Sequence, residues 1–212
     1  MPLFKDTGGD PRELVATILA LYGALGDAAC GNPRGFAARK AGAAVAFAEA
    51  AGVDAGTRDA LAFAATLHAV GAIGNAQGGD APVLAARRCA QIAALPPATA
   101  ELVRAQAEHW DGTGFPDQLR WDAVPFPAQL LLLAEIVLRS TGEDEALERV
   151  NAESGRALAP PVAAAYAAWA LHGGGAVEPV VLPYAALDAG ACDPGALFEL
   201  VAVTVARAVG AS

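Results

Sequence analysis

Apolar residues recur at helical spacing along most of this chain, and glycines or prolines interrupt the pattern between segments. In the first segment Leu14, Ile18, Leu21 and Leu25 lie three or four residues apart, which is typical of one helix face. Only residues 177–182 read as a short extended run, and nowhere does a convincing strand alternation occur. The chain is therefore predicted to be all-α. The expected helices span residues 10–30, 35–51, 55–73, 82–95, 97–110, 126–140, 143–151, 160–171 and 194–209.

The length of 212 residues suits one domain with an extension. Three consecutive glycines, Gly173, Gly174 and Gly175, mark a hinge after the helical part. We therefore expect one compact helical domain over residues 1–171, followed by a C-terminal extension over residues 172–212.

The apolar content is high, so a membrane location has to be considered. Hydrophobic residues make up 55% of the chain, but much of this is alanine, which favours helices and is only weakly hydrophobic. A spanning helix needs roughly 20 consecutive apolar residues, and polar residues such as Glu49 and Gln129 interrupt the apolar runs 43–53 and 125–138. Residues 1–6 lack the apolar core of a signal peptide. We expect no membrane partner.

The remaining composition favours a cytoplasmic protein that binds no nucleic acid. The three cysteines are an odd number without a CxxC pair, which is typical of reduced thiols in a cytoplasm. The net charge is −9, whereas binding to a phosphate backbone needs a positive surface. No phosphate-binding loop ending in Lys-Ser/Thr and no GxSxG nucleophile motif occurs.

The most specific signal lies between residues 108 and 138. Glu108 and His109 precede a run of seven residues, followed by Leu119, by Val124 with Pro125, and by an apolar helix. The run resembles the Trp-Asp-Gly-Thr-Gly-Tyr-Pro motif of HD-GYP domains, with phenylalanine in place of tyrosine. The run, the residues Leu119, Val124 and Pro125, and the apolar helix occur in the family's order over about thirty residues, which makes the resemblance specific. The seven residues are Trp110, Asp111, Gly112, Thr113, Gly114, Phe115 and Pro116.

The resemblance extends over residues 10–171. Residues 67–74 resemble the family's Leu-His-Asp-Ile-Gly-Lys-Ile-Gly segment, and residues 154–160 resemble its late Gly-x-x-Phe-Asp-Pro turn. The resemblance implies an HD-domain-like helical bundle of bacterial origin. It also implies metal-dependent hydrolysis of cyclic di-GMP, in which bound metals lower the pKa of a water molecule.

The sequence departs from the family at nearly every metal-ligand position. Imidazole and carboxylate ligands are required there, whereas the matching positions carry other residues, and Ala72 replaces the family's lysine. Only Glu135, in place of a later aspartate, retains a ligating group. We therefore expect no catalytic residue, no metal and no cofactor. The substituted positions are Phe36, Ala69, Ala85, Gln106 and Ala107.

Four residues form a candidate remnant of the site: His68, Glu108, His109 and Glu135. Each also has a structural interpretation. His68 lies on a helix stripe and suits a core histidine, and His109 suits the end of a helix, where a cation is favoured. Glu135 suits a buried acid bonded by the backbone or by Trp110. The loop 110–116 itself can be a turn built on its glycines.

These observations predict a pseudo-enzyme, not an enzyme, that serves as a binding or regulatory module in cyclic di-GMP signalling. By resemblance, the loop 110–116 would contact a GGDEF-type diguanylate cyclase, and the extension would pack back or form a homodimer interface. Two alternatives remain open. One is a metal-free cyclic di-GMP sensor. The other is a phosphohydrolase that holds one metal with the four remnant residues.

Overall fold

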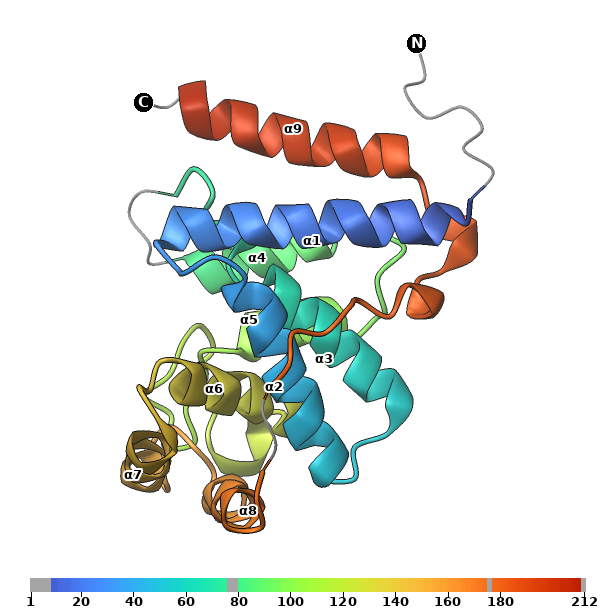
Figure 1. Cartoon of the computed structure of the whole chain (residues 1–212). Helices are drawn as coiled ribbons and strands as arrows, with labels where there is room; N and C mark the ends of the chain where they lie inside the picture. The colour runs from blue at the N-terminus through green and yellow to red at the C-terminus, as the bar shows by residue number, and fades with distance from the viewer. Residues whose placement is uncertain (1–8, 76–79, 175–176, 211–212) are drawn as a thin grey trace.

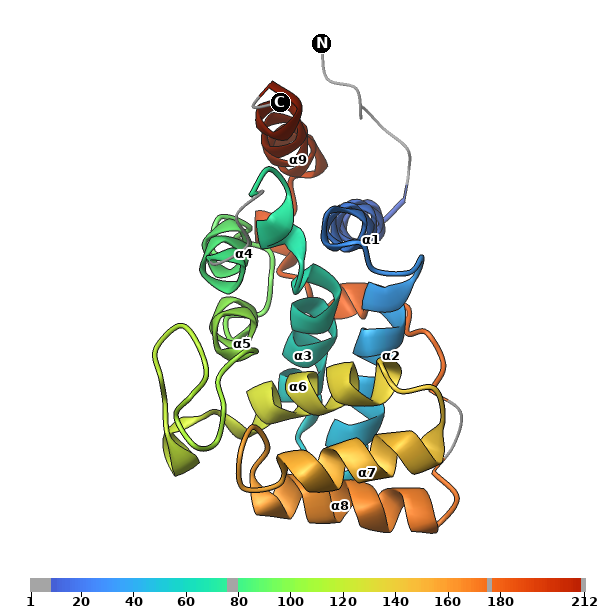
Figure 2. The ribbon, with the colours of Figure 1, turned by 90° about the vertical axis from the view of Figure 1, so that its left-hand side faces the viewer.

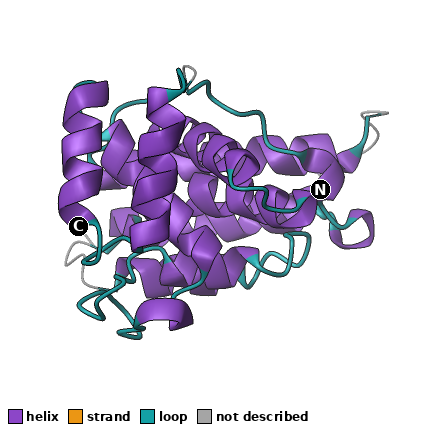
Figure 3. Ribbon diagram, turned by 90° about the horizontal axis from the view of Figure 1, so that it is seen from below, coloured by secondary structure: helices purple, strands orange, loops and turns teal. Residues whose placement is uncertain are grey.

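The structure is a computed structural model that describes residues 9–75, 80–174 and 177–210. Within these ranges it is helical throughout, without a β-strand, as Figure 3 shows. The predicted all-α class is confirmed. The α-helices are α1 Pro11–Cys30, α2 Phe36–Ala50, α3 Ala55–Leu67, α4 Ala81–Cys89, α5 Thr99–Ala105, α6 Phe126–Leu138, α7 Glu143–Glu153, α8 Pro160–Leu171 and α9 Pro194–Gly210.

Local signals explain both ends of α1. The Asp10 side chain accepts a hydrogen bond from the Arg12 amide, and Pro11 occupies the first turn. At the other end, Gly31 adopts a left-handed φ of 70° and closes the helix. By length and composition α1 is a candidate membrane-spanning helix among the described residues. It lies outside the apolar runs 43–53 and 125–138, and the sequence pattern alone did not identify it. In this structure 44% of its apolar window is buried inside the protein.

The helices form three tiers in Figure 1, with α1 and α9 above, α2 and α3 in the middle, and α6, α7 and α8 below. Figure 2 shows α4 and α5 beside α3. The middle tier is rich in buried alanine, including Ala41 and Ala44 of α2 and Ala60 and Ala64 of α3, and these two helices pack on each other. Small side chains at a helix contact allow the helix axes to approach closely.

Three predicted helices are shorter in the structure. The third ends at Leu67, and Val70–Ala72 form a 3-10 turn instead. The fourth ends at Cys89, and residues 90–95 form turns. The backbone of this stretch bonds to the C-terminal segment, because Ala94 O accepts a hydrogen bond from the Asp188 amide at 3.0 Å. The fifth ends at Ala105, where the chain turns into the loop that follows.

The C-terminal segment packs back on the helices. Leu182, Leu187 and Leu197 are buried in the common core, and the Tyr22 hydroxyl lies 3.4 Å from Thr204 of α9. Residues 177–182 form no strand, and the Val180 amide donates to Ala38 O at 3.3 Å. The extension therefore belongs to the folded body. The division of the chain at residue 171 stays a prediction.

Two neighbouring residues test this packing. Leu182 is 7% exposed and Val181 is 87% exposed. Replacing buried Leu182 by alanine leaves a cavity, so Leu182→Ala should lower the free energy of unfolding by about 2–4 kcal/mol. The matched control Val181→Ala should change it by less than about 0.5 kcal/mol. Urea titrations that find the two variants equally stable would contradict the packing of this segment.

Candidate functional site

An ion pair between a buried lysine and a half-buried glutamate occupies the centre of the candidate site. Lys40 of α2 is almost completely buried, and its Nζ lies 2.7 Å from Oε2 of Glu135 on α6. The ammonium also donates to Oε1 of Gln106 at 3.4 Å. The Lys40 charge, the largest cause, lowers the pKa of Glu135 to about 2, so this carboxylate is charged at neutral pH. A buried ammonium is tolerated only with such partners.

His68 lies beside this pair at the end of α3. Its Nδ1 is 2.8 Å from Ala65 O, a hydrogen bond that places the proton on Nδ1 and leaves Nε2 unprotonated. Burial, followed by the Lys40 charge, lowers the pKa of His68 to about 3. The imidazole is therefore neutral. The Phe36 ring lies against it, with centroids 5.8 Å apart.

Asp27 joins the end of α1 to this site. Its Oδ2 accepts the Ala37 amide in the first turn of α2 at 2.7 Å, and its Oδ1 accepts from Asn32 at 3.1 Å. The same Oδ1 lies 4.0 Å from Nε2 of His68, beyond hydrogen-bond distance. Because both oxygens serve the α1–α2 connection, Asp27 fixes the start of α2, and Lys40 follows one turn later.

Two further side chains complete the network. Gln106 donates from Nε2 to His68 O at 2.9 Å, which links α5 to the end of α3. Arg139 donates to Oε1 of Glu135 at 3.0 Å and lies over the Phe36 ring at 5.0 Å. Glu135 is thus bonded by two cations, and not by the backbone or Trp110 as the structural interpretation expected.

These residues do not fit the metal ions that the HD-GYP resemblance implies. Over residues 9–75, 80–174 and 177–210, no group of three or more histidine, cysteine or carboxylate side chains could hold a metal. The Lys40 ammonium stands between Glu135 and Gln106, two residues that match family ligand positions. A cation supplied by the chain thereby neutralises the carboxylate that a metal would bind.

The sequence contained a signal for Lys40 that motif matching did not use. Phe36, Lys40, Ala44 and Phe47 are four, four and three residues apart, so they share one helix face, and all four are buried. A lysine on the apolar stripe of an alanine-rich helix requires an anionic partner within reach of its ammonium group. Glu135, the acid within the apolar segment 126–138, is that partner.

Glu108 and His109 serve the loop instead. Glu108 is buried, and its carboxylate accepts the backbone amides of Asp117 and Leu119. His109 lies 3.1 Å from the Thr113 hydroxyl. Of the four remnant residues, the structure brings His68 and Glu135 together around Lys40 and places Glu108 and His109 in the loop 108–126.

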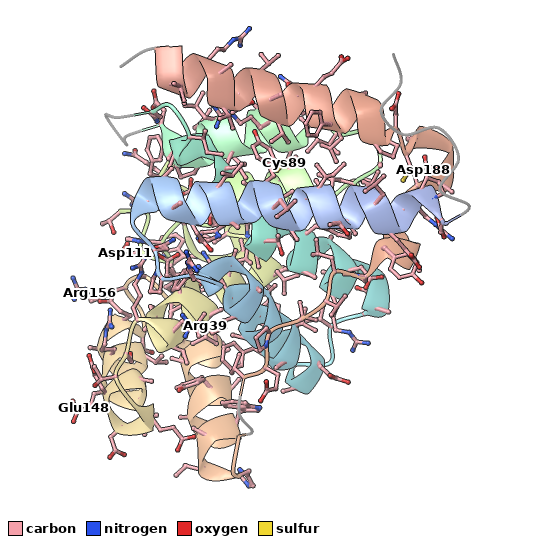
Figure 4. The ribbon with its side chains drawn as sticks, turned by 45° about the horizontal axis from the view of Figure 1, so that its top comes forward. Arg39, Cys89, Asp111, Glu148, Arg156 and Asp188 are labelled. Atoms are coloured by element: carbon pink, nitrogen blue, oxygen red, sulfur yellow. The ribbon has the colours of Figure 1, made fainter. Side chains whose placement is uncertain are left out.

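The glycines of the motif are explained by backbone packing. Gly112 has a φ of 81°, which other residues resist. A Cβ added at Gly114 would lie 2.1 Å from His109 N and 2.6 Å from Ala107 O, so no side chain fits there. Asp111 accepts from the Thr113 amide at 2.9 Å and closes the turn. Figure 4 shows Asp111 near Arg156, whose carbonyl accepts the Asp111 amide at 2.8 Å.

The loop presents aromatic rings to solvent. Phe115 is 39% exposed, Trp121 is 61% exposed and Phe126 is exposed at the start of α6. Trp121 also has a φ of 53°, in the left-handed region that bulky residues rarely adopt. Of these rings, Phe126 lines a hollow of about 230 Å³. Its other lining residues are Trp110, Asp122, Val124, Pro125, Gln129, Ala159, Pro161 and Val162.

Comparison with known proteins identifies the fold. No family model and no curated protein sequence matches the chain. Among solved structures it is similar to a cyclic GMP-AMP specific phosphodiesterase of V. cholerae, V-cGAP3, with a TM-score of 0.68 at 18% sequence identity. The match covers 93% of this chain and 60% of that chain, so this chain spans about three fifths of its neighbour's length. The HD-domain-like helical fold predicted from the motifs is confirmed.

The same comparison corrects one prediction. The missing ligands led to the expectation that the chain is not an enzyme, yet the structure that shares its fold is named a phosphodiesterase. The prediction is wrong because it excluded activity from absent family ligands alone. The Lys40–Glu135–His68 cluster is a set of polar groups that the ligand positions by themselves did not reveal.

The buried histidine predicts how stability depends on pH. The pKa of His68 in the folded chain is about 3, below its usual value near 6.5. Between these two pH values the unfolded chain is protonated at His68 and the folded chain is not. The stability of the folded state is therefore unaffected by His68 protonation above pH 6.5, and it decreases as the pH falls from 6.5 toward 3. The loss is at most about 1.4 kcal/mol per pH unit. Glu135 adds a loss in the same direction, below pH 4.5 and toward about 2.

Urea titrations between pH 7 and 5 check this expectation. His68→Gln should flatten the dependence of the unfolding free energy on pH, and His172→Gln, a change at an exposed histidine, should leave it as in the parent. Equal slopes for the His68 variant and the parent would show that the folded His68 binds a proton at its ordinary pKa.

Proposed function

We propose that this protein is a regulatory binding module in cyclic-dinucleotide signalling, and that its loop 108–126 contacts a protein partner. The supporting observation is that this loop has a fixed backbone and exposed aromatic side chains. Buried Glu108 holds two of its amides, while Phe115 and Trp121 remain in solvent. Aromatic residues on a fixed backbone are typical anchors of protein interfaces.

The conformation of Trp121 supports the same proposal. A bulky residue with a φ of 53° costs of order 1–3 kcal/mol, and such costs occur mainly at functional positions. Glycine would relieve this strain. A tryptophan kept there, with most of its ring in solvent, is better explained by a contact that the ring makes than by folding.

The signalling context rests on two likenesses. The motif 110–116 resembles that of HD-GYP domains, and the fold is shared with a protein named as a cyclic GMP-AMP phosphodiesterase. We infer an HD-GYP relative in which Lys40 stands among the former ligand positions. The partner we expect is a GGDEF-type diguanylate cyclase, which would place an apolar side chain in the hollow beside Phe126.

Substitution of the exposed rings tests the interface. Trp121→Gly should change the free energy of unfolding by less than about 1 kcal/mol, since the ring is mostly exposed and glycine relaxes the backbone at 121. Phe115→Ala should lower it by about 1–2 kcal/mol, because the Phe115 side chain is partly buried, and should leave the protein folded. Each should weaken binding to a purified GGDEF domain at least about tenfold in titration calorimetry. Leu171→Ala on α8, another exposed apolar residue, is the matched control. Stable ring variants that bind as tightly as the control would refute the interface.

A second candidate is phosphodiester hydrolysis, which the name of the fold neighbour favours. The residues at the site do not fit the multi-metal centre of HD-GYP domains, so we assign no catalytic step to them. Purified protein incubated with cyclic GMP-AMP or cyclic di-GMP, with and without added Mn²⁺ or Fe²⁺, decides this candidate. Product formation that Glu135→Gln abolishes would establish hydrolysis at this site. No product from either substrate would remove the candidate.

A further inference from the structure

The outward face of α9 has a regular pattern of charged and small residues. Leu197 and Thr204 are buried against the rest of the protein, which fixes the inner face of the helix. Figures 1 and 2 both show α9 lying along α1 at one edge of the molecule. The exposed outer positions include Glu199, Ala202, Val203, Ala206 and Arg207.

This edge carries much of the exposed apolar surface. Val203 and Val209 of α9 are exposed, as are Leu21 and Leu25 of the neighbouring α1. No charged residue occurs in α1 between Glu13 and Asp27. Large apolar side chains exposed on two neighbouring helices indicate a surface that a partner can cover.

The charges on α9 indicate what that partner is. Glu199 and Arg207 lie four residues before and four residues after Val203. Along one helix they are roughly 12 Å apart, too far to pair. Within the part of the chain that the structure describes, neither side chain forms an ion pair. An antiparallel second helix, related by a two-fold axis at Val203, would place each Glu199 opposite Arg207 of the other copy.

We propose that two copies of this chain associate through α9, antiparallel, about a two-fold axis at Val203. The same patch meets itself, so the complementary charges on one helix form two ion pairs across the interface. Ala202 and Ala206 flank the axis, and their small side chains allow the helices to approach to about 8 Å between axes. This inference is independent of the function proposed for the loop 108–126.

A charge exchange tests the proposal on the full chain by sedimentation velocity. Glu199→Arg and Arg207→Glu, made singly, should each weaken dimerisation at least about tenfold, because like charges then face each other. The double variant restores opposite charges and should return to within about threefold of the parent. Glu148→Arg, on α7 away from α9 in Figure 4, is the control and should change nothing.

Crosslinking locates the axis. In a background with Cys30→Ser and Cys192→Ser, Val203→Cys should form an intermolecular disulfide with a mild oxidant, because residues on the axis meet their own copies. Glu199→Cys should not, since its copies would be roughly 12 Å apart along the helices. A parent that stays monomeric at micromolar concentrations would overturn the proposal. So would a double charge variant no better than the single ones, or efficient crosslinking at 199 rather than 203.

Discussion

The ion pair between buried Lys40 and half-buried Glu135 is the interaction on which the arrangement of the site depends. It joins α2 to α6, and through Gln106 it reaches α5 and the end of α3. Removing the Glu135 carboxylate would leave the Lys40 ammonium buried with only the Gln106 amide oxygen as a partner, whereas Glu135 would keep Arg139 if Lys40 were removed. Burial and the Lys40 charge lower the pKa of the neighbouring His68, so its imidazole is neutral. Four helices thus share one electrostatic centre.

Local chain geometry places that centre. Asp27, at the end of α1, caps α2, so Lys40 enters the core one turn later. The Lys40 side chain extends from α2 to Glu135 on α6 and to Gln106 at the end of α5. Capping and charge pairing therefore depend on one another at this site.

The sequence predicted the helical class and the motif loop because both depend on local signals: helical spacing, proline and glycine breaks, and an ordered motif. It did not predict where α3 and α5 end, since tertiary contacts decide that: the Gln106 side chain bonds His68 O, and Gly114 packs on the backbone of His109. Glu108 and His109 were grouped with His68 by proximity to a motif, whereas their side chains bond to the loop. Lys40 was missed because it matches no family position.

Glu108 belongs to the motif loop and not to the cluster around Lys40. Its carboxylate accepts the amides of Asp117 and Leu119, and among the described residues no hydrogen bond or ion pair joins it to the Lys40 centre. The backbone of the loop is therefore held by hydrogen bonds separate from those of the Lys40 centre. Gly112 and Gly114 are explained by this backbone alone, but Phe115 and Trp121 are not, because both rings are in solvent. Backbone packing explains the conformation of the loop, and the partner contact proposed above would explain why the loop exposes these rings.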